Sequence, residues 1–68
     1  MWEYRIFKTD RWWGIYKRKQ QWNVLIVSYL NWHNLWTPHK TYAKIFYSED
    51  AVVNALVTMK ARDEKKSD

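Results

Sequence analysis

The chain has no cysteine, and this absence limits how a chain of 68 residues can be stabilised. Disulfides and thiolate metal sites are unavailable to it, while so short a chain buries only about 60% of the surface that it exposes when unfolded. Side-chain packing must therefore supply the stability. The thirteen aromatic residues, six of them tryptophan, can do so, because each can bury on the order of 150–250 Å². Many of these rings are needed for the core before any function is considered.

The pattern of apolar residues predicts a single α+β domain over residues 1–68. Alternating polar and apolar positions, β-branched side chains and intervening turn residues indicate strands, and one segment has helical spacing. The predicted strands cover residues 2–8, 12–17, 22–30 and 41–47, the predicted helix covers about 49–62, and 63–68 form a tail. We expect a small antiparallel sheet of three or four strands with the C-terminal helix packed on one face.

Several segments carry more specific expectations. Residues 22–30 are apolar on both faces, which favours a central strand covered on both sides; a helix through this run is the alternative. Gly14, the only glycine, lies in the second predicted strand and indicates a bulge or a close approach to the backbone. The polar run 17–21 is interpreted as a hairpin turn, and residues 31–40, with the only proline, as a long loop.

Ser48 marks the start of the helix. Its hydroxyl can accept a hydrogen bond from a free backbone amide, and Glu49 and Asp50 place negative charge at the positive end of the helix dipole. An apolar stripe at helical spacing is expected to face the core, and it consists of Val52, Ala55, Leu56 and Met59. Val53 and Val57 widen this stripe, so they either pack on more of the sheet or form the seam of a homodimer.

The positive charge is concentrated in the first part of the chain. Residues 1–40 carry seven cations and two acids, a net charge of +5, whereas residues 41–68 carry five of each. All six tryptophans also lie within residues 1–40. An asymmetry of this kind concerns partners more than the fold, and it favours nucleic acid or another acidic partner.

The sequence has no pattern typical of catalysis. His33 and His39 share one loop but lack the further ligands that zinc requires. The acidic residues are explained by helix capping and solubility, and no nucleophile motif or glycine-rich phosphate loop is present. We therefore expect a binding protein that is not an enzyme and needs no metal or cofactor.

The compartment is inferred from the same composition. The first ten residues are charged where a secretory signal would be apolar, and the longest uncharged stretch, residues 20–39, is too polar to span a membrane. The absence of cysteine is compatible with a reducing compartment. We expect a cytoplasmic protein that does not contact membranes.

The stretch RWWGIYKRKQQW, residues 11–22, is the main candidate site. Arginine and lysine neutralise phosphates, and exposed aromatic rings stack on bases. The sheet face that one helix leaves uncovered would display Arg5 and Phe7 with parts of Trp12, Tyr16 and Arg18. The predicted nucleic-acid-binding residues are Arg5, Arg11, Trp12, Tyr16, Lys17, Arg18, Lys19 and Trp22. The competing interpretation is that the rings fill the core and residues 17–19 form a solvated hairpin tip.

The order of several features resembles a known group of DNA-binding domains. These features are Gly14, the basic run Lys17-Arg18-Lys19, Trp22, Phe46-Tyr47-Ser48, Glu49-Asp50-Ala51 and Ala55. In this order they look like the plant ethylene-response-factor type of domain and its relatives in phage homing endonucleases, and they are also similar to the arm-site-binding domains of phage-type integrases. The resemblance covers about residues 13–60.

This resemblance implies a three-stranded sheet in the DNA major groove with the helix packed behind it. It also implies that residues 17–19, Trp22 and Arg11 face the DNA. The chain departs from the pattern in four respects: the helix acids sit one position early, the loop 31–40 is long and rich in tryptophan, the N-terminal strand is extra, and the sheet is less basic.

A protein partner is the alternative, because tryptophan, tyrosine and arginine are also enriched in protein–protein hot spots. Trp32, His33 and Trp36, close to the only proline, would form such a contact loop. A looser similarity is to small early proteins of bacteriophages, which are aromatic-rich, poor in glycine and free of cysteine. That similarity implies an inhibitor or adaptor that acts in the host cytoplasm on a host protein of the restriction, CRISPR or polymerase machinery.

Overall fold

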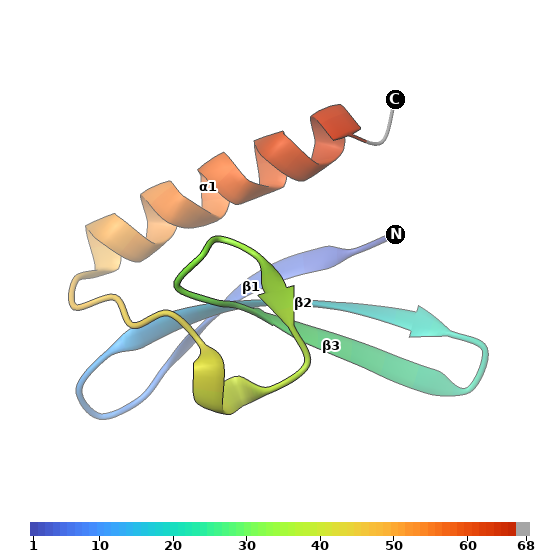
Figure 1. Ribbon diagram of the computed structural model, residues 1–68, viewed down its shortest axis with the longest axis horizontal. Helices are drawn as coiled ribbons and strands as arrows, with labels where there is room; N and C mark the ends of the chain where they lie inside the picture. The colour runs from blue at the N-terminus through green and yellow to red at the C-terminus, as the bar shows by residue number, and fades with distance from the viewer. Residues whose placement is uncertain (67–68) are drawn as a thin grey trace.

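The computed structural model describes residues 1–66 and confirms the predicted α+β architecture (Figure 1). The elements are β1 (Glu3–Lys8), β2 (Trp13–Gln21), β3 (Val24–Leu30), β4 (Trp36–Thr37), the 3₁₀ turn η1 (Lys40–Tyr42) and the helix α1 (Glu49–Lys66). The four strands form one antiparallel sheet in the order β1-β2-β3-β4. The helix crosses one face of this sheet. It includes residues 63–66 of the predicted tail, and residues 67–68 lie outside the described residues.

Thr9 organises the turn between β1 and β2. Its amide donates to the carbonyl of Trp12 at 2.8 Å, and its hydroxyl accepts from the amide of Trp12 at 3.2 Å. The strand register then runs without interruption from the pair Glu3–Arg18 to the pair Lys8–Trp13. No bulge lies in this strand pair, so the first of the two alternatives predicted at Gly14 is wrong. The second is confirmed, because the ring of Phe7 closely approaches the backbone at Gly14.

The hairpin between β2 and β3 differs from the prediction. Residues 17–21 do not form a turn but continue β2, and Gln21 pairs with Val24 across a two-residue loop. Charged and polar side chains are compatible with this strand because successive residues point to opposite faces. Residues 24–30 are confirmed as a strand, not a helix, but they are not covered on both sides. The first two residues of β3, Val24 and Leu25, are exposed, and they lie where the β2–β3 hairpin extends past the end of β1.

The fourth strand lies within the predicted loop, and the prediction of a strand over 41–47 is wrong. The side-chain oxygen of Asn31 accepts from the amides of His33 at 2.9 Å and Leu35 at 3.0 Å. Asn34 adopts a positive φ of 60°. These two features turn the chain back, so that Trp36 pairs with Leu30.

Residues 43–46 cross the end of the sheet and contact two different strands. The amide of Lys44 donates to the carbonyl of Leu30 at 2.7 Å, and Phe46 exchanges two hydrogen bonds with Trp13 at 2.7 and 2.9 Å. Ala43 and Phe46 are buried, whereas Tyr47 is 78% exposed. Buried and exposed side chains therefore do not alternate along this segment in the way that the sequence pattern of a strand predicts.

The core lies between the sheet and α1, and its buried side chains are Ile15, Leu30, Ala43, Phe46, Val52 and Met59. Ala55 and Leu56 pack beside them, which confirms the predicted helical stripe. Val53 and Val57 are exposed. The hydroxyl of Ser48 accepts from the amide of Ala51 at 3.1 Å, as expected for a helix cap. Within residues 1–66, no helix combines the length and apolar character needed to cross a membrane.

Candidate nucleic-acid interface

Strand pairing determines which side chains share the sheet face opposite α1. Cross-strand partners point to the same side of a sheet, and neighbours along a strand point to opposite sides. Ile15 points into the core under α1, so its neighbour Tyr16 lies on the other face. We call that other face the open face. Its residues are Glu3, Arg5, Phe7, Gly14, Tyr16, Arg18, Gln20, Leu25, Val27 and Tyr29.

Four half-buried aromatic rings form a cluster: Phe7, Tyr16 and Tyr29 of the open face, and Trp12, which precedes β2 and contacts Phe7. The centroid of the Phe7 ring lies 5.6 Å from that of Trp12, 6.0 Å from that of Tyr16 and 5.9 Å from that of Tyr29. Phe7 can occupy this central place because it lies over Gly14, where a Cβ atom would be only 2.3 Å from its Cζ. Each of these four residues is half-buried and not fully buried, so the cluster keeps exposed surface that a ligand can contact.

Three cations surround the aromatic cluster. Arg5 and Arg18 both donate through Nε to Oε1 of Glu3, at 2.6 and 2.7 Å. These two hydrogen bonds lower the pKa of Glu3, with the larger effect from Arg5, and so keep the Glu3 carboxylate ionised. The Nζ of Lys40 lies 5.1 Å from the centroid of the Phe7 ring, within the range of a cation–π contact. Arg18 and Lys40 line a hollow of about 240 Å³ whose other walls are Phe7, Tyr16, Leu25, Val27 and Tyr29.

The structure removes Lys17 from the predicted interface. Strand alternation turns its side chain toward α1, and the residue is only 9% exposed. Its Nζ lies 4.4 Å from the ring centroids of both Trp2 and Trp36 and 3.6 Å from Oδ2 of Asp63. Burial lowers the pKa of Lys17, and the charge of Asp63 partly offsets this effect. Lys17 is therefore an internal cation held by aromatic rings and cannot contact a phosphate.

The remaining predicted residues fall into three places. The open face carries Arg5, Tyr16 and Arg18, with Trp12 in ring contact with Phe7. Arg11 is exposed in the turn before β2, and Trp22 is 89% exposed at the tip of the β2–β3 hairpin. Lys19 lies on the same side as Lys17, with its Nζ 4.7 Å from the Trp2 ring centroid.

One aromatic residue and one cation of this surface, Tyr29 and Lys40, are absent from the sequence-based prediction. Tyr29 pairs with Tyr16, and this pair follows from placing the hairpin loop at residues 22–23. The strand pattern thus contained a signal for Tyr29, but the polar residues 17–21 obscured it. Lys40 is the first residue of η1 and reaches Phe7 through the tertiary fold alone. No local pattern in the sequence indicates that contact.

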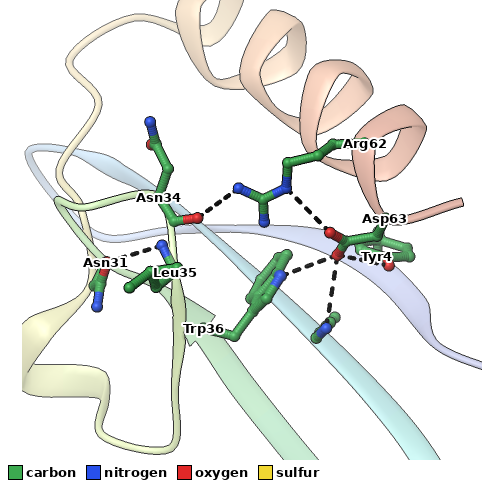
Figure 2. A network of polar contacts seen from close by, with 8 residues as sticks. Tyr4, Asn31, Asn34, Leu35, Trp36, Arg62 and Asp63 are labelled. Atoms are coloured by element: carbon green, nitrogen blue, oxygen red, sulfur yellow. Dashed lines mark hydrogen bonds and ion pairs between the residues drawn. The ribbon is translucent and has the colours of Figure 1, made fainter. Parts of the chain in front are cut away.

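The opposite face contains a polar network centred on Asp63 (Figure 2). The Oδ2 of Asp63 accepts from the hydroxyl of Tyr4 at 3.0 Å and from Nε1 of Trp36 at 2.9 Å, and its Oδ1 accepts from Nε of Arg62 at 3.2 Å. Burial raises the pKa of Asp63, but these hydrogen bonds outweigh it and leave that pKa below its usual value. Burial, and then the bond to Asp63, raise the pKa of Tyr4 to about 12.

This network changes the interpretation of the predicted contact loop. Trp36 is half-buried and holds the sheet to α1, so it belongs to the structural network. Trp32 is 56% exposed and His33 is also exposed. The structure therefore separates Trp36 from the two other residues predicted to bind a protein partner.

No group of three histidine, aspartate or glutamate residues within residues 1–66 could hold a metal ion. Comparisons of the chain with protein-family models, with curated proteins and with solved structures gave no match.

Proposed function

We propose that the protein binds nucleic acid through the open face of its sheet and does not act as an enzyme. The observation that carries this proposal is the half-buried aromatic cluster, which lies beside Arg5, Arg18 and Lys40. Aromatic rings can stack on bases, while cations neutralise phosphates and release their counterions. The sheet thus combines the two kinds of contact that a nucleic acid offers.

The distribution of charge between the layers supports the same proposal. Residues 1–48, which include the sheet, carry eight cations and two acids, a net charge of +6. Residues 49–66, which form α1, carry four cations and four acids. Residues 11–48 contain no aspartate or glutamate at all. An approaching polyanion is therefore attracted to the sheet layer and not to the helix.

Glu3 has a positioning role in this proposal. It is the only acidic residue of the open face, and it holds Arg5 and Arg18 side by side. The contacts with Glu3 use Nε, whereas the terminal nitrogens carry four of the five donors of each guanidinium. Two oriented guanidinium groups lose less side-chain entropy on binding phosphate than two free ones.

The proposal is tested by neutralising the two arginines. In the variant Arg5→Gln/Arg18→Gln, we expect at least about tenfold weaker binding of short DNA and RNA oligonucleotides and a shallower dependence of affinity on salt. Fluorescence anisotropy at low and near-physiological salt measures both. The matched control is Lys60→Gln/Lys65→Gln, which removes the same charge from exposed positions of α1 and should retain affinity within about twofold. If the wild-type protein binds no oligonucleotide at low salt, the proposal is wrong.

A second candidate function, as an inhibitor or adaptor of another protein, is favoured by an exposed patch elsewhere. Trp32, Leu35 and Tyr42 are 56%, 61% and 64% exposed. Trp32, His33 and Tyr42 line a common hollow of about 270 Å³. If this patch is the binding site, Trp32→Ala should abolish capture of the partner in pulldowns, whereas Arg5→Gln/Arg18→Gln should retain it. The opposite result would exclude this candidate.

A further inference from the structure

The sheet narrows to two strands at one end. Pairing between β1 and β2 ends at Glu3–Arg18, so residues 19–21 pair only with residues 24–26 of β3. We call residues 19–26 the arm. Figure 1 shows this hairpin extending past the other strands, with its tip away from α1. All side chains from Gln20 to Leu25 are exposed.

The tip of the arm is strained. Trp22 has a φ of 59°, in the left-handed region that bulky side chains rarely adopt. Hairpin loops of two residues normally place glycine, asparagine or aspartate where φ is positive. The Trp22 side chain is 89% exposed, so burial within the chain does not offset this cost. A strained and exposed tryptophan has no explanation in the fold, and backbone strain of this kind is typical of functional sites.

The arm and the residue at its base, Arg18, together carry polar and positively charged groups on both faces, and Lys19 is the one cation of the arm itself. Lys19 and Gln21 lie on the side of α1, while Gln20 and, at the base of the arm, Arg18 lie on the open face. No acidic residue occurs in the arm. In the groove of a double helix, phosphates flank an inserted ribbon on both sides, and the major groove of DNA admits a two-stranded ribbon. Cations on both faces match a duplex groove better than they match a single strand.

From these features we propose that the arm enters a groove of double-stranded DNA and that Trp22 inserts between neighbouring base pairs. This inference rests on the proposed nucleic-acid function and names its substrate class. Apolar side chains inserted at a base step unstack it and kink the duplex. Val24 and Leu25, which are 59% and 53% exposed, flank Trp22 on the two faces of the arm and would contact the sugars beside the opened step. Arg18 and Lys19 would contact the two phosphate backbones.

The variant Trp22→Gly tests the inference, because glycine adopts a positive φ without strain and the hairpin should therefore be retained. Trp22→Asn, which also tolerates this conformation, is the second variant. The probe is a DNA duplex with 2-aminopurine at a central step, whose fluorescence rises when the base is unstacked. We expect the wild-type protein to raise this fluorescence. Both variants should bind the duplex at least about tenfold more weakly and leave the fluorescence unchanged, with an unchanged or higher melting temperature.

Trp32→Ala is the matched control, since it removes another exposed tryptophan that lies outside the arm, and it should behave as the wild type. Equal duplex affinity and equal 2-aminopurine fluorescence in the wild type and in both Trp22 variants would overturn the inference and leave open-face binding intact. If the wild-type protein binds the single strand but not the duplex, the inference about the arm is also overturned and open-face binding is again left intact. If the wild type binds neither probe at low salt, the proposed function and this inference are both wrong.

Discussion

Phe7 lies at the centre of the open face because its cross-strand partner, Gly14, has no side chain. In Gly14→Ala the new Cβ would lie 2.3 Å from Cζ and 2.5 Å from Cε1 of Phe7, so the ring must move away from its aromatic neighbours. We expect the free energy of unfolding to fall by about 1–3 kcal/mol, an overpacking cost reduced by the better strand entropy of alanine. Urea denaturation measures this change.

A second substitution separates steric overlap from other effects of alanine at position 14. Leucine at position 7 removes the distal ring atoms that meet the new Cβ, so the two substitutions should be non-additive. Phe7→Leu/Gly14→Ala is expected to be more stable than the sum of the single variants predicts. A Gly14→Ala protein as stable as the wild type would contradict the close packing of this pair.

Residue types could be predicted from the sequence better than residue orientations. Of the cations and rings of residues 11–22, Arg11 and Trp22 are exposed and most of the others are half-buried, while Lys17 and Arg18 lie on opposite faces. The strand register determines which face of the sheet each side chain occupies, and a shift of one residue would exchange the faces of Lys17 and Arg18. Because the polar run 17–21 looks like a turn, its register is not evident from the sequence. Lys40 depends on tertiary folding alone, so no sequence pattern could place it beside Phe7.

At the level of elements, segments with a consistent local pattern were predictable. The strands β1 and β3, the start of β2 and the helix α1 follow the sequence periodicity, and the fold class follows from them. The region 31–47 was not predictable, because the side-chain hydrogen bonds of Asn31 and the positive φ of Asn34 create β4. Both are effects of single asparagine residues, and alternation of apolar residues does not report them.

Helix packing yields a prediction at this scale. Val52 is fully buried under the sheet, whereas Val57, on the same helix, is 62% exposed. Val52→Ala removes two buried methyl groups and leaves a cavity, so it should lower the free energy of unfolding by about 2–3 kcal/mol. Val57→Ala should change it by less than about 0.5 kcal/mol. Thermal unfolding of both variants at several protein concentrations measures these values.

The concentration series also tests the homodimer seam predicted at Val53 and Val57. A dimer that is linked to folding makes the melting temperature rise with protein concentration. If the seam exists, Val57→Ala should reduce this dependence and lose more stability than its exposed position predicts. If the melting temperature is independent of concentration and Val57→Ala is neutral, no such seam contributes to folding.

On the scale of the whole molecule, Asp63 connects α1 to three strands. It interacts with Tyr4 of β1 and Trp36 of β4 (Figure 2), and with Lys17 of β2. Its pKa is lowered from the usual value of 3.8, so it contributes stability that is fully present above that value and is lost as the pH falls through the lower, folded-state pKa. The protein should therefore unfold in acid as Asp63 is protonated, and the exposed Glu3, whose pKa is also lowered, adds to the loss in the same direction.

The variant Asp63→Asn tests this linkage. It leaves the mostly buried Lys17 without its ionic partner, so at neutral pH we expect a loss of about 2–4 kcal/mol, because an uncompensated internal charge is costly. As the pH falls from 3.8 through the lower, folded-state pKa of Asp63, the wild type and the variant should converge in stability, because the carboxyl is then protonated in both the folded and the unfolded state. Urea denaturation between neutral and acidic pH, followed by circular dichroism, measures both. Glu64→Gln, the exposed neighbouring position on α1, should retain the wild-type profile. A constant difference between Asp63→Asn and the wild type at every pH would show that Asp63 acts through shape and not through its charge.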